Sequence, residues 1–200
     1  MARPKATIEP SRLVSAFAAH GVTGITSDQL AELARVAKPT LYAHGHTKET
    51  LFLLAVEIEV ERLLDRLYRA ERLTRGRSAR DRATGAAHAI LNHGAVRPDG
   101  LRLIVRAAHE RTVAGGDDAT AAVSRVPDRL TVALRRDLSA DGLDATLAPL
   151  LARALWGATL ALAVGPTGEN RPKRERIAGL AASLIPPPPS LPPKQWPPAT

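Results

Sequence analysis

Residues 26–51 read TSDQLAELARVAKPTLYAHGHTKETL and contain two short helical patterns, a tight turn between them and the start of another helix. The first pattern opens with Thr26 and Gln29 at the spacing of a capping box, in which each side chain accepts a hydrogen bond from a backbone N–H that would otherwise be free. Pro39 has a φ angle already set for the first turn of a helix, so a second helix is expected to begin near Lys38. Two short helices that meet at a sharp angle are typical of a helix-turn-helix, whose second helix reads DNA.

The residues on either side of this pattern extend it to a small domain. Thr47 is the expected N-cap of a third, longer helix. An earlier helix is expected over residues 11–20, with Phe17 at the centre of the domain's core. Within the second helix of the motif, Leu41 alone is expected to face inward and to join the same core.

Many positions within residues 13–54 follow one spacing. They are Phe17, Gly21, Ile25, Thr26, Leu30, Ala31, Ala34, Val36, residues 38–42, Thr47, Lys48, Glu49 and Leu51. This pattern resembles the N-terminal DNA-binding domain of the tetracycline-repressor (TetR) family of bacterial transcriptional regulators. The sequence departs from the family at Arg35, Ala37 and Gly45, where the family usually has Gly, Ser and an aromatic residue. Without the Ser, the recognition helix lacks a side-chain cap worth about 1 kcal/mol.

The resemblance implies an all-α protein, with a three-helix helix-turn-helix domain followed by a larger helical domain for ligand binding and dimerisation. We divide the chain into residues 1–50 for DNA binding, residues 51–185 for effector binding and dimerisation, and residues 186–200 as a proline-rich tail. The implied function is that of a ligand-responsive transcriptional regulator. We expect a repressor that binds a palindromic double-stranded DNA operator as a homodimer and is released by a small hydrophobic effector.

The resemblance also implies which residues lie at the DNA. Base edges in the major groove need donors and acceptors from one helical face, and phosphates need cations and N–H groups beside it. On the recognition helix, the residues expected at the DNA are Lys38, Pro39, Thr40, Tyr42 and His44. Two other helix starts match positions that contact phosphates in the family, and their residues are Thr26, Gln29 and Lys48.

The composition favours the same fold class and limits the chemistry. The chain is rich in Ala, Leu and Arg and contains no Cys, which favours helices and excludes disulfides and thiolate metal sites. The net charge is +8, and residues 62–82 hold eight arginines against three acidic residues. That run is expected to be a solvated helix face, with long-range attraction to DNA phosphate as the alternative. The N-terminus has no apolar signal segment, so we expect a cytoplasmic protein.

Beyond the first domain, the apolar spacing predicts further helices. They are expected over residues 48–72, over 79–93, from residue 98, from residue 117, over 145–164 and over 173–185. Pro127 should kink or restart the fourth of these. The very apolar helix over 145–164 is expected to be a core or interface helix, because Arg153 near its middle argues against a membrane span.

These helices predict both an effector cavity and a dimer interface. Their Leu, Ile, Val and Ala side chains favour an aliphatic or flexible hydrophobic effector, held by a few polar groups. Candidate ligand contacts are His88, Asn92, Arg106, His109 and Trp156. Family members pair their last two long helices with those of a second subunit, and the candidate interface residues are Leu150, Ala154, Gly157, Ala161, Ile177, Leu180, Ala181 and Leu184.

The sequence contains no recognisable catalytic or metal-binding constellation. His88 and His93, for example, are five residues apart and point away from each other on a helix. We therefore expect neither enzymatic activity nor a metal or cofactor. Two alternative functions stay open. One is a basic protein-interaction module that acts through its arginine-rich helix and its polyproline II tail. The other is a DNA-binding regulator without a functional ligand pocket.

Overall fold

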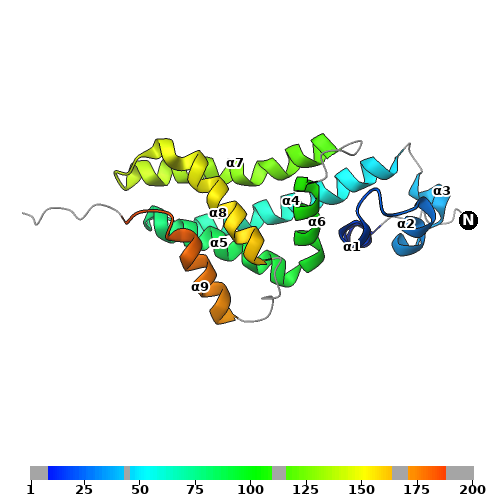
Figure 1. Ribbon diagram of the computed structural model, residues 1–200, viewed down its shortest axis with the longest axis horizontal. Coiled ribbons are helices and arrows are strands. Elements are labelled where there is room, and N and C mark those ends of the chain that lie inside the picture. The colour runs from blue at the N-terminus through cyan, green and yellow to red at the C-terminus, as the bar shows by residue number, and fades with distance from the viewer. Residues whose placement is uncertain (1–8, 43–45, 110–115, 164–170, 188–200) are drawn as a thin grey trace, which may run out of the picture.

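The computed structural model describes residues 9–42, 46–109, 116–163 and 171–187, and the regular elements of these residues are helices (Figure 1). The all-α fold class predicted from the sequence is confirmed. His44 and residues 188–200 lie outside the described residues. The elements in chain order are α1 (Pro10–His20), α2 (Ser27–Ala34), α3 (Lys38–Leu41), α4 (Lys48–Leu73), α5 (Ala79–Val96), α6 (Pro98–His109), α7 (Gly116–Ala140), the 3₁₀ helix η2 (Ala145–Leu147), α8 (Ala148–Ala163) and α9 (Arg171–Ala182).

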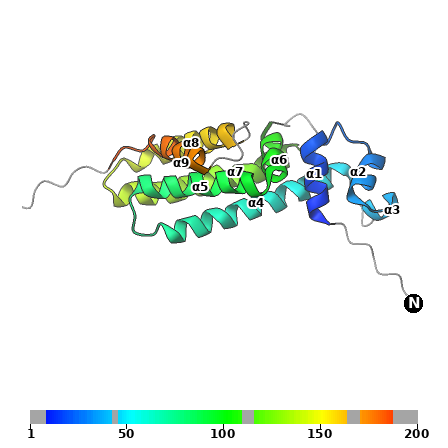
Figure 2. The ribbon, with the colours of Figure 1, turned by 90° about the horizontal axis from the view of Figure 1, so that it is seen from below.

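Helices α1, α2 and α3 form one end of an elongated molecule, and α4 runs from this end into a second group of helices (Figure 1). In the second group, α5 packs against α4, α8 and α9, while α7 packs against α4 and α8. Figure 2 shows α4 on one side of this group and the α8–α9 pair on the other, with α5 between them. Helix α6 contacts α1 as well as α4, α5 and α7, so it joins the two groups of helices.

Both helix starts expected in the helix-turn-helix region are capped by side chains. Thr26 Oγ1 accepts from the Gln29 N–H at 3.2 Å, and Gln29 Oε1 accepts from the Thr26 N–H at 2.9 Å. The Thr47 hydroxyl likewise accepts from the Thr50 N–H, and Thr50 Oγ1 accepts from the Thr47 N–H at 2.7 Å. The predicted capping box and the predicted N-cap are therefore confirmed.

The backbone conformation of the turn between α2 and α3 is one that suits glycine. Arg35 is in the left-handed conformation, with φ 54° and ψ 42°, and among the described residues it is the one non-glycine with a positive φ. A residue with a Cβ adopts this conformation at a cost of roughly 1–2 kcal/mol. Ala37, at the N-cap of α3, makes no side-chain cap. Helix α3 accordingly begins uncapped after a strained turn and covers only residues 38–41.

Phe17 lies at the centre of the small core, as predicted. Its ring is fully buried and meets the ring of Phe52 edge-on, with 5.4 Å between the ring centroids. Leu41 is also fully buried, so α3 is fixed to the domain by its one inward side chain. Because Phe52 belongs to α4, the core of the N-terminal domain includes the start of that helix.

The second group of helices departs from the sequence expectations at two points. Helix α7 is continuous through Pro127, so the restart is not observed; proline removes only one backbone donor, and the turns on either side keep theirs. The helix expected from residue 145 begins at Ala148, because Asp144 caps a separate 3₁₀ turn by accepting from the Thr146 N–H at 2.9 Å. Among the described residues, no helix is both long and apolar enough to cross a membrane.

Candidate functional sites

On α3, Lys38 and Pro39 are exposed and Thr40 is half-buried, while Leu41 points into the core. Lys38 Nζ lies 2.8 Å from Asp28 Oδ1 at the start of α2, and this hydrogen bond raises the pKa of Lys38 above its ordinary value. Both side chains of the pair are largely exposed, at 51% and 80%. Exposed pairs contribute only about 0–1 kcal/mol, so Lys38 can exchange Asp28 for a phosphate at little cost.

Tyr42 connects α3 to α2. Its ring is half-buried, as expected for a packed ring, and its hydroxyl lies 2.8 Å from Ser27 Oγ. The hydroxyl is therefore engaged within the protein. This contact positions the end of α3 against the start of α2.

Lys48 makes a similar contact from the start of α4. Its Nζ donates to the Ile25 carbonyl at 3.1 Å, and the side chain is half-buried. Contacts from α3 and from α4 thus converge on residues 25–28, just where α2 begins. We call this set of contacts the α2 anchor. The sequence analysis assigned Lys48 to phosphate contact, but it did not identify Ser27 or Asp28, which only the tertiary contacts reveal.

Thr26 and Gln29 lie on the same surface, and both are exposed. Their capping bonds use the Thr26 hydroxyl oxygen and the Gln29 amide oxygen as acceptors. The Thr26 O–H and the Gln29 NH₂ group keep their donors for another partner. Donors of this kind beside a helix N-terminus suit an anionic group such as a phosphate.

A buried ionic cluster lies where α4, α5 and α6 meet. The Glu59 carboxylate is fully buried and accepts two bonds from the Arg97 guanidinium, Nε at 2.8 Å and Nη2 at 2.6 Å. Arg62 Nη1 lies 2.5 Å from Glu59 Oε1. Nε2 of the equally buried His93 is 3.5 Å from Glu59 Oε2, which is long for a hydrogen bond. We call these four residues the Glu59 cluster.

The cluster makes Glu59 a strong acid. Burial alone would raise the pKa of Glu59, but the contacts of its carboxylate with His93, Arg97 and Arg62 outweigh burial and lower the pKa to about 2. Because the His93 contact is long, we attribute most of this lowering to the two bonds from Arg97. The charged form of Glu59 is therefore part of the folded state.

Helix α6 lies directly on the Glu59 carboxylate. A Cβ atom added at Gly100 would be 2.2 Å from Glu59 Oε2, so this position accepts only glycine without a shift of the packing. The neighbouring residue Asp99 accepts a hydrogen bond from the Ser15 hydroxyl of α1 at 2.8 Å. One turn of α6 therefore contacts both α4 and α1.

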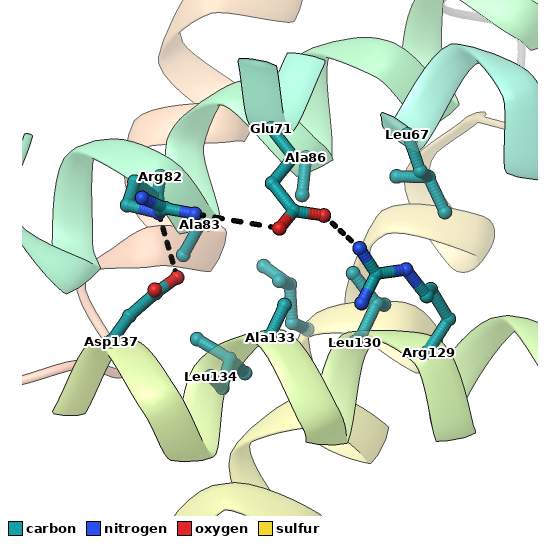
Figure 3. A pocket seen from close by; sticks show the side chains of 11 residues that line it. Leu67, Glu71, Arg82, Ala83, Ala86, Arg129, Leu130, Ala133, Leu134 and Asp137 are labelled. Atoms are coloured by element: carbon teal, nitrogen blue, oxygen red, sulfur yellow. Dashed lines mark hydrogen bonds and ion pairs between the residues drawn. The ribbon is translucent and has the colours of Figure 1, made fainter. Parts of the chain in front are cut away.

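Helices α4, α5, α7 and α8 enclose a small apolar pocket, shown in Figure 3. Leucines and alanines of α4, α5, α7 and α8 line most of it, and Glu71, Arg82, Arg129 and Asp137 lie along one side. Its free volume is about 30 Å³. This is room for about two water molecules, far below the volume that drug-sized ligands occupy.

A larger groove opens on the other side of these charged residues. It has a volume of about 480 Å³ and is lined by Tyr68, Glu71, Arg72, Arg75, Arg82, Arg129 and Arg136. Burial tends to raise the pKa of Glu71, but the nearby guanidinium groups of Arg136, Arg129 and Arg82 outweigh this and lower it. The groove is thus a charged site with a fixed carboxylate among its arginines.

The five residues predicted to contact the effector do not share a cavity. His88 and Asn92 line a shallow surface depression of about 340 Å³ between α4 and α5. Trp156 is buried, Arg106 is half-buried and His109 is exposed, and none of the three lines the pockets described above. Among the described residues, no group of three or more His, Asp or Glu side chains could hold a metal ion.

The outer faces of α8 and α9 expose several of the predicted interface residues. Leu150 and Leu180 are each 67% exposed. Three more of these residues, Gly157, Ala161 and Leu184, are also exposed. Ala154 is half-buried, and the side chain of Ala181 lies outside the described residues.

Ile177 departs from that prediction, because it is buried within its own chain. It lies on the side of α9 that packs against the bundle, three positions from the exposed Leu180. Ile177 therefore belongs to the core of its own chain and not to the exposed residues of α8 and α9.

No family model matches this sequence, and no curated protein sequence matches it. Solved structures match over most of the chain. A TetR-like transcriptional regulator from Rhodococcus sp. RHA1 is 24% identical, with a TM-score of 0.70 over 88% of this chain and 90% of that one. A protein from Clostridium perfringens, described as a proposed fatty acid metabolism regulator, is 16% identical, with a TM-score of 0.72 over 88% and 98% of the two chains.

A further match is AibR, whose structure was solved with isovaleryl coenzyme A and operator DNA. It is 17% identical, with a TM-score of 0.65 over 88% of this chain and 98% of AibR. At these identities the likeness concerns the fold. The chain has the fold of TetR-like transcriptional regulators.

Proposed function

We propose that this protein is a DNA-binding transcriptional regulator whose reading head is the helix-turn-helix of α2 and α3 together with the start of α4. The α2 anchor carries this proposal. It fixes the exposed side of α3 and the N-termini of α2 and α4 on one surface, through the contacts of Lys38, Tyr42 and Lys48. Donors and cations on one surface are what the edges of bases and the flanking phosphates require.

In this proposal Thr40, Lys38 and His44 face the major groove, and Pro39 and Tyr42 lie beside them. Thr26, Gln29 and Lys48 contact phosphates from the starts of α2 and α4. The free N–H groups at these helix starts add to the attraction for phosphate.

The functional unit is a homodimer formed through the exposed residues of α8 and α9. Leu150, Leu180 and Leu184 are large apolar side chains that a monomer leaves in water. A palindromic operator requires two reading heads about 34 Å apart, and a twofold axis through α8 and α9 would supply the second one. Leu180→Glu should therefore yield monomers in sedimentation and weaken operator binding in proportion, whereas a dimer of normal affinity would exclude this interface.

We further propose a repressor that a small-molecule effector releases from DNA. The structure of AibR with isovaleryl coenzyme A and operator DNA supports a fold that accommodates both a small molecule and DNA. A regulator without a functional ligand pocket is the second candidate, because the apolar pocket has a free volume of only about 30 Å³. The two candidates predict the same DNA binding and differ in the response to a ligand.

A footprint on the promoter of the protein's own operon tests the proposal. We expect protection of two half-sites one helical turn apart, and loss of this protection in a Lys38→Ala, Thr40→Ala double variant. Leu33→Ala, an exposed position on α2 away from the proposed DNA surface, serves as the matched control. Equal, sequence-independent binding by all three proteins would contradict a reading function for α3.

A further inference from the structure

The groove at the C-terminal end of α4 gathers arginines from three helices. Arg72 and Arg75 lie at or just beyond the end of α4, Arg82 is on α5, and Arg129 and Arg136 are on α7. This end of α4 is the one away from the DNA-binding domain (Figure 1). The groove has a volume of about 480 Å³, which is within the range of small-molecule sites.

Only part of this positive charge is balanced within the protein. Glu71 pairs with Arg136 at 2.8 Å, with Arg82 at 3.7 Å and with Arg129. Asp137 pairs with Arg82 at 2.7 Å and with Arg136 at 2.9 Å. Two carboxylates therefore pair with three arginines and neutralise only part of their positive charge.

The two arginines nearest the end of α4 have no such partner. Among the described residues, neither Arg72 nor Arg75 has a side-chain partner, and both are exposed. The buried Nε of Arg129 is also without a hydrogen-bond partner in this part of the chain. The groove thus keeps three unbalanced positive charges and unused donors, which suit a ligand with two negative charges.

The groove has an apolar side as well. Glu71, Arg82 and Arg129 line both the groove and the apolar pocket, which Figure 3 shows. On the inner side, the small side chains of Ala83, Ala86 and Ala133 face each other across the pocket. At the outer side, the Tyr68 ring is exposed beneath the Arg129 guanidinium, 4.6 Å from it.

We propose that this groove binds a small anionic amphiphile, with a phosphate or carboxylate group on the arginines and a short apolar group against the exposed Tyr68 ring. Planar guanidinium groups bind both kinds of oxyanion through paired hydrogen bonds. Arg72, Arg75 and Arg136 are the primary contacts. In the ligand-free protein the Glu71 carboxylate pairs with Arg136, so it competes with the ligand for one of these contacts.

A consequence for regulation follows, and it rests on the proposed function. Glu71 is on α4, and its partners Arg129 and Arg136 are on α7. A ligand that takes these arginines from Glu71 weakens the contact between α4 and α7. Since α4 begins at the α2 anchor, its movement changes the placement of the reading head.

Calorimetry on the full chain without DNA tests the site directly. Hexyl phosphate, hexanoate, inorganic phosphate and hexanol serve as probes. We expect hexyl phosphate to bind about tenfold or more tightly than either inorganic phosphate or hexanol, since it alone combines the two groups. Comparison with hexanoate shows which oxyanion the arginines favour. Equal heats for all four probes, or no binding of hexyl phosphate, would overturn the proposal.

Two pairs of variants separate ligand binding from a structural role. Arg72→Ala with Arg75→Ala should weaken hexyl phosphate binding about tenfold or more and leave the fold intact, since neither side chain has a protein partner. Arg77→Ala in the same turn removes a cation outside the groove and should change nothing. Unchanged affinity in the double variant would refute the assignment.

The effect of Glu71→Gln on ligand affinity distinguishes a residue that competes with the ligand from one that only stabilises the fold. It should raise the affinity for hexyl phosphate about fivefold, because the internal competitor loses its charge. Glu61→Gln is the matched control, since Glu61 also pairs α4 with α7, through Arg125, but lies outside the groove. An equal effect of both variants on binding would contradict the role of Glu71.

Duplex DNA is the competing occupant of an arginine groove. If Arg72→Ala with Arg75→Ala weakened operator binding and left hexyl phosphate binding unchanged, the groove would be an accessory DNA site and the proposal would be wrong. These titrations are run without DNA, so a failure of the proposed DNA-binding function would not alter them. Conversely, failure of the hexyl phosphate titration would leave the footprint intact.

Discussion

The α2 anchor and the Glu59 cluster both join α4 to neighbouring helices, but they do so in opposite environments. At the anchor, Lys38 and Asp28 are largely exposed and Lys48 is half-buried. In the cluster, Glu59 and His93 are fully buried. An exposed contact can exchange its partner for a phosphate or water, whereas a buried charge cannot lose its partner without a large cost. The contacts at the start of α4 can therefore change partners, whereas those at its middle are fixed.

Removing the main partner of Glu59 should have the largest effect. Arg97→Ala leaves a carboxylate buried without its two strongest bonds, and we expect the free energy of unfolding to fall by about 3–5 kcal/mol. Urea denaturation measures this change. Arg102→Ala, which breaks an exposed pair with Asp99 on the same helix, should cost no more than about 0.5 kcal/mol. Similar losses in the two variants would remove the distinction between fixed and adaptable contacts.

Acid should remove the contribution of the Glu59 cluster to stability. The pKa of Glu59 is lowered from its ordinary value of 4.5 to about 2, so its contribution to stability is present above pH 4.5 and is lost as pH falls toward 2. The full contribution is on the order of 3 kcal/mol. Thermal unfolding of wild type and Glu59→Gln between pH 6 and pH 2.5 measures it. The difference in thermal stability between wild type and Glu59→Gln should shrink as the pH falls through this window. A difference that is the same at every pH would show that protonation of Glu59 is not coupled to unfolding.

At the anchor, Lys48→Ala should change DNA binding more than stability. We expect operator affinity to fall about fivefold to tenfold on every sequence, and the slope of log affinity against log salt to flatten by about 0.9, as for one lost phosphate contact. Lys48 also holds the Ile25 carbonyl, so a small loss of thermal stability accompanies this change. An unchanged salt slope with weaker binding would mean that Lys48 acts only by positioning α2.

The smallest effect is expected in the turn that precedes α3. Arg35→Gly relieves a left-handed conformation and should raise the free energy of unfolding by about 0.5–1 kcal/mol. Arg77→Gly is the control, because Arg77 does not have a positive φ and glycine there should cost a few tenths of a kcal/mol. If both variants lost stability, the strain assigned to this turn would be absent.

The features that the sequence predicted correctly depend on neighbouring residues. The capping box of Thr26 and Gln29 and the cap at Thr47 are confirmed because three-residue spacings define them. Phe17 and Leu41 were assigned to the core from apolar spacing within single helices. The family resemblance added the order of the helices, and with it the fold.

The features that the sequence did not predict bring together residues from distant helices. The arginine run of residues 62–82 was noticed, but its meeting with Arg129 and Arg136 depends on how α7 packs against α4. The predicted effector contacts were single polar residues in apolar helices, which give no indication of a shared cavity. Glu59 could have been identified from the sequence, since an acidic residue at an apolar position between Val56 and Leu63 indicates a buried charge that needs a partner.

Gly100 has a consequence for how this protein can diverge. Its missing side chain makes room for the Glu59 carboxylate, and that carboxylate requires Arg97 in turn. A lineage cannot change one of these three residues and retain the other two at full stability. Among descendants of a common ancestor, glycine, acid and arginine should therefore be inherited as a set or replaced as a set, with larger residues at position 100 appearing only where the acid has been lost.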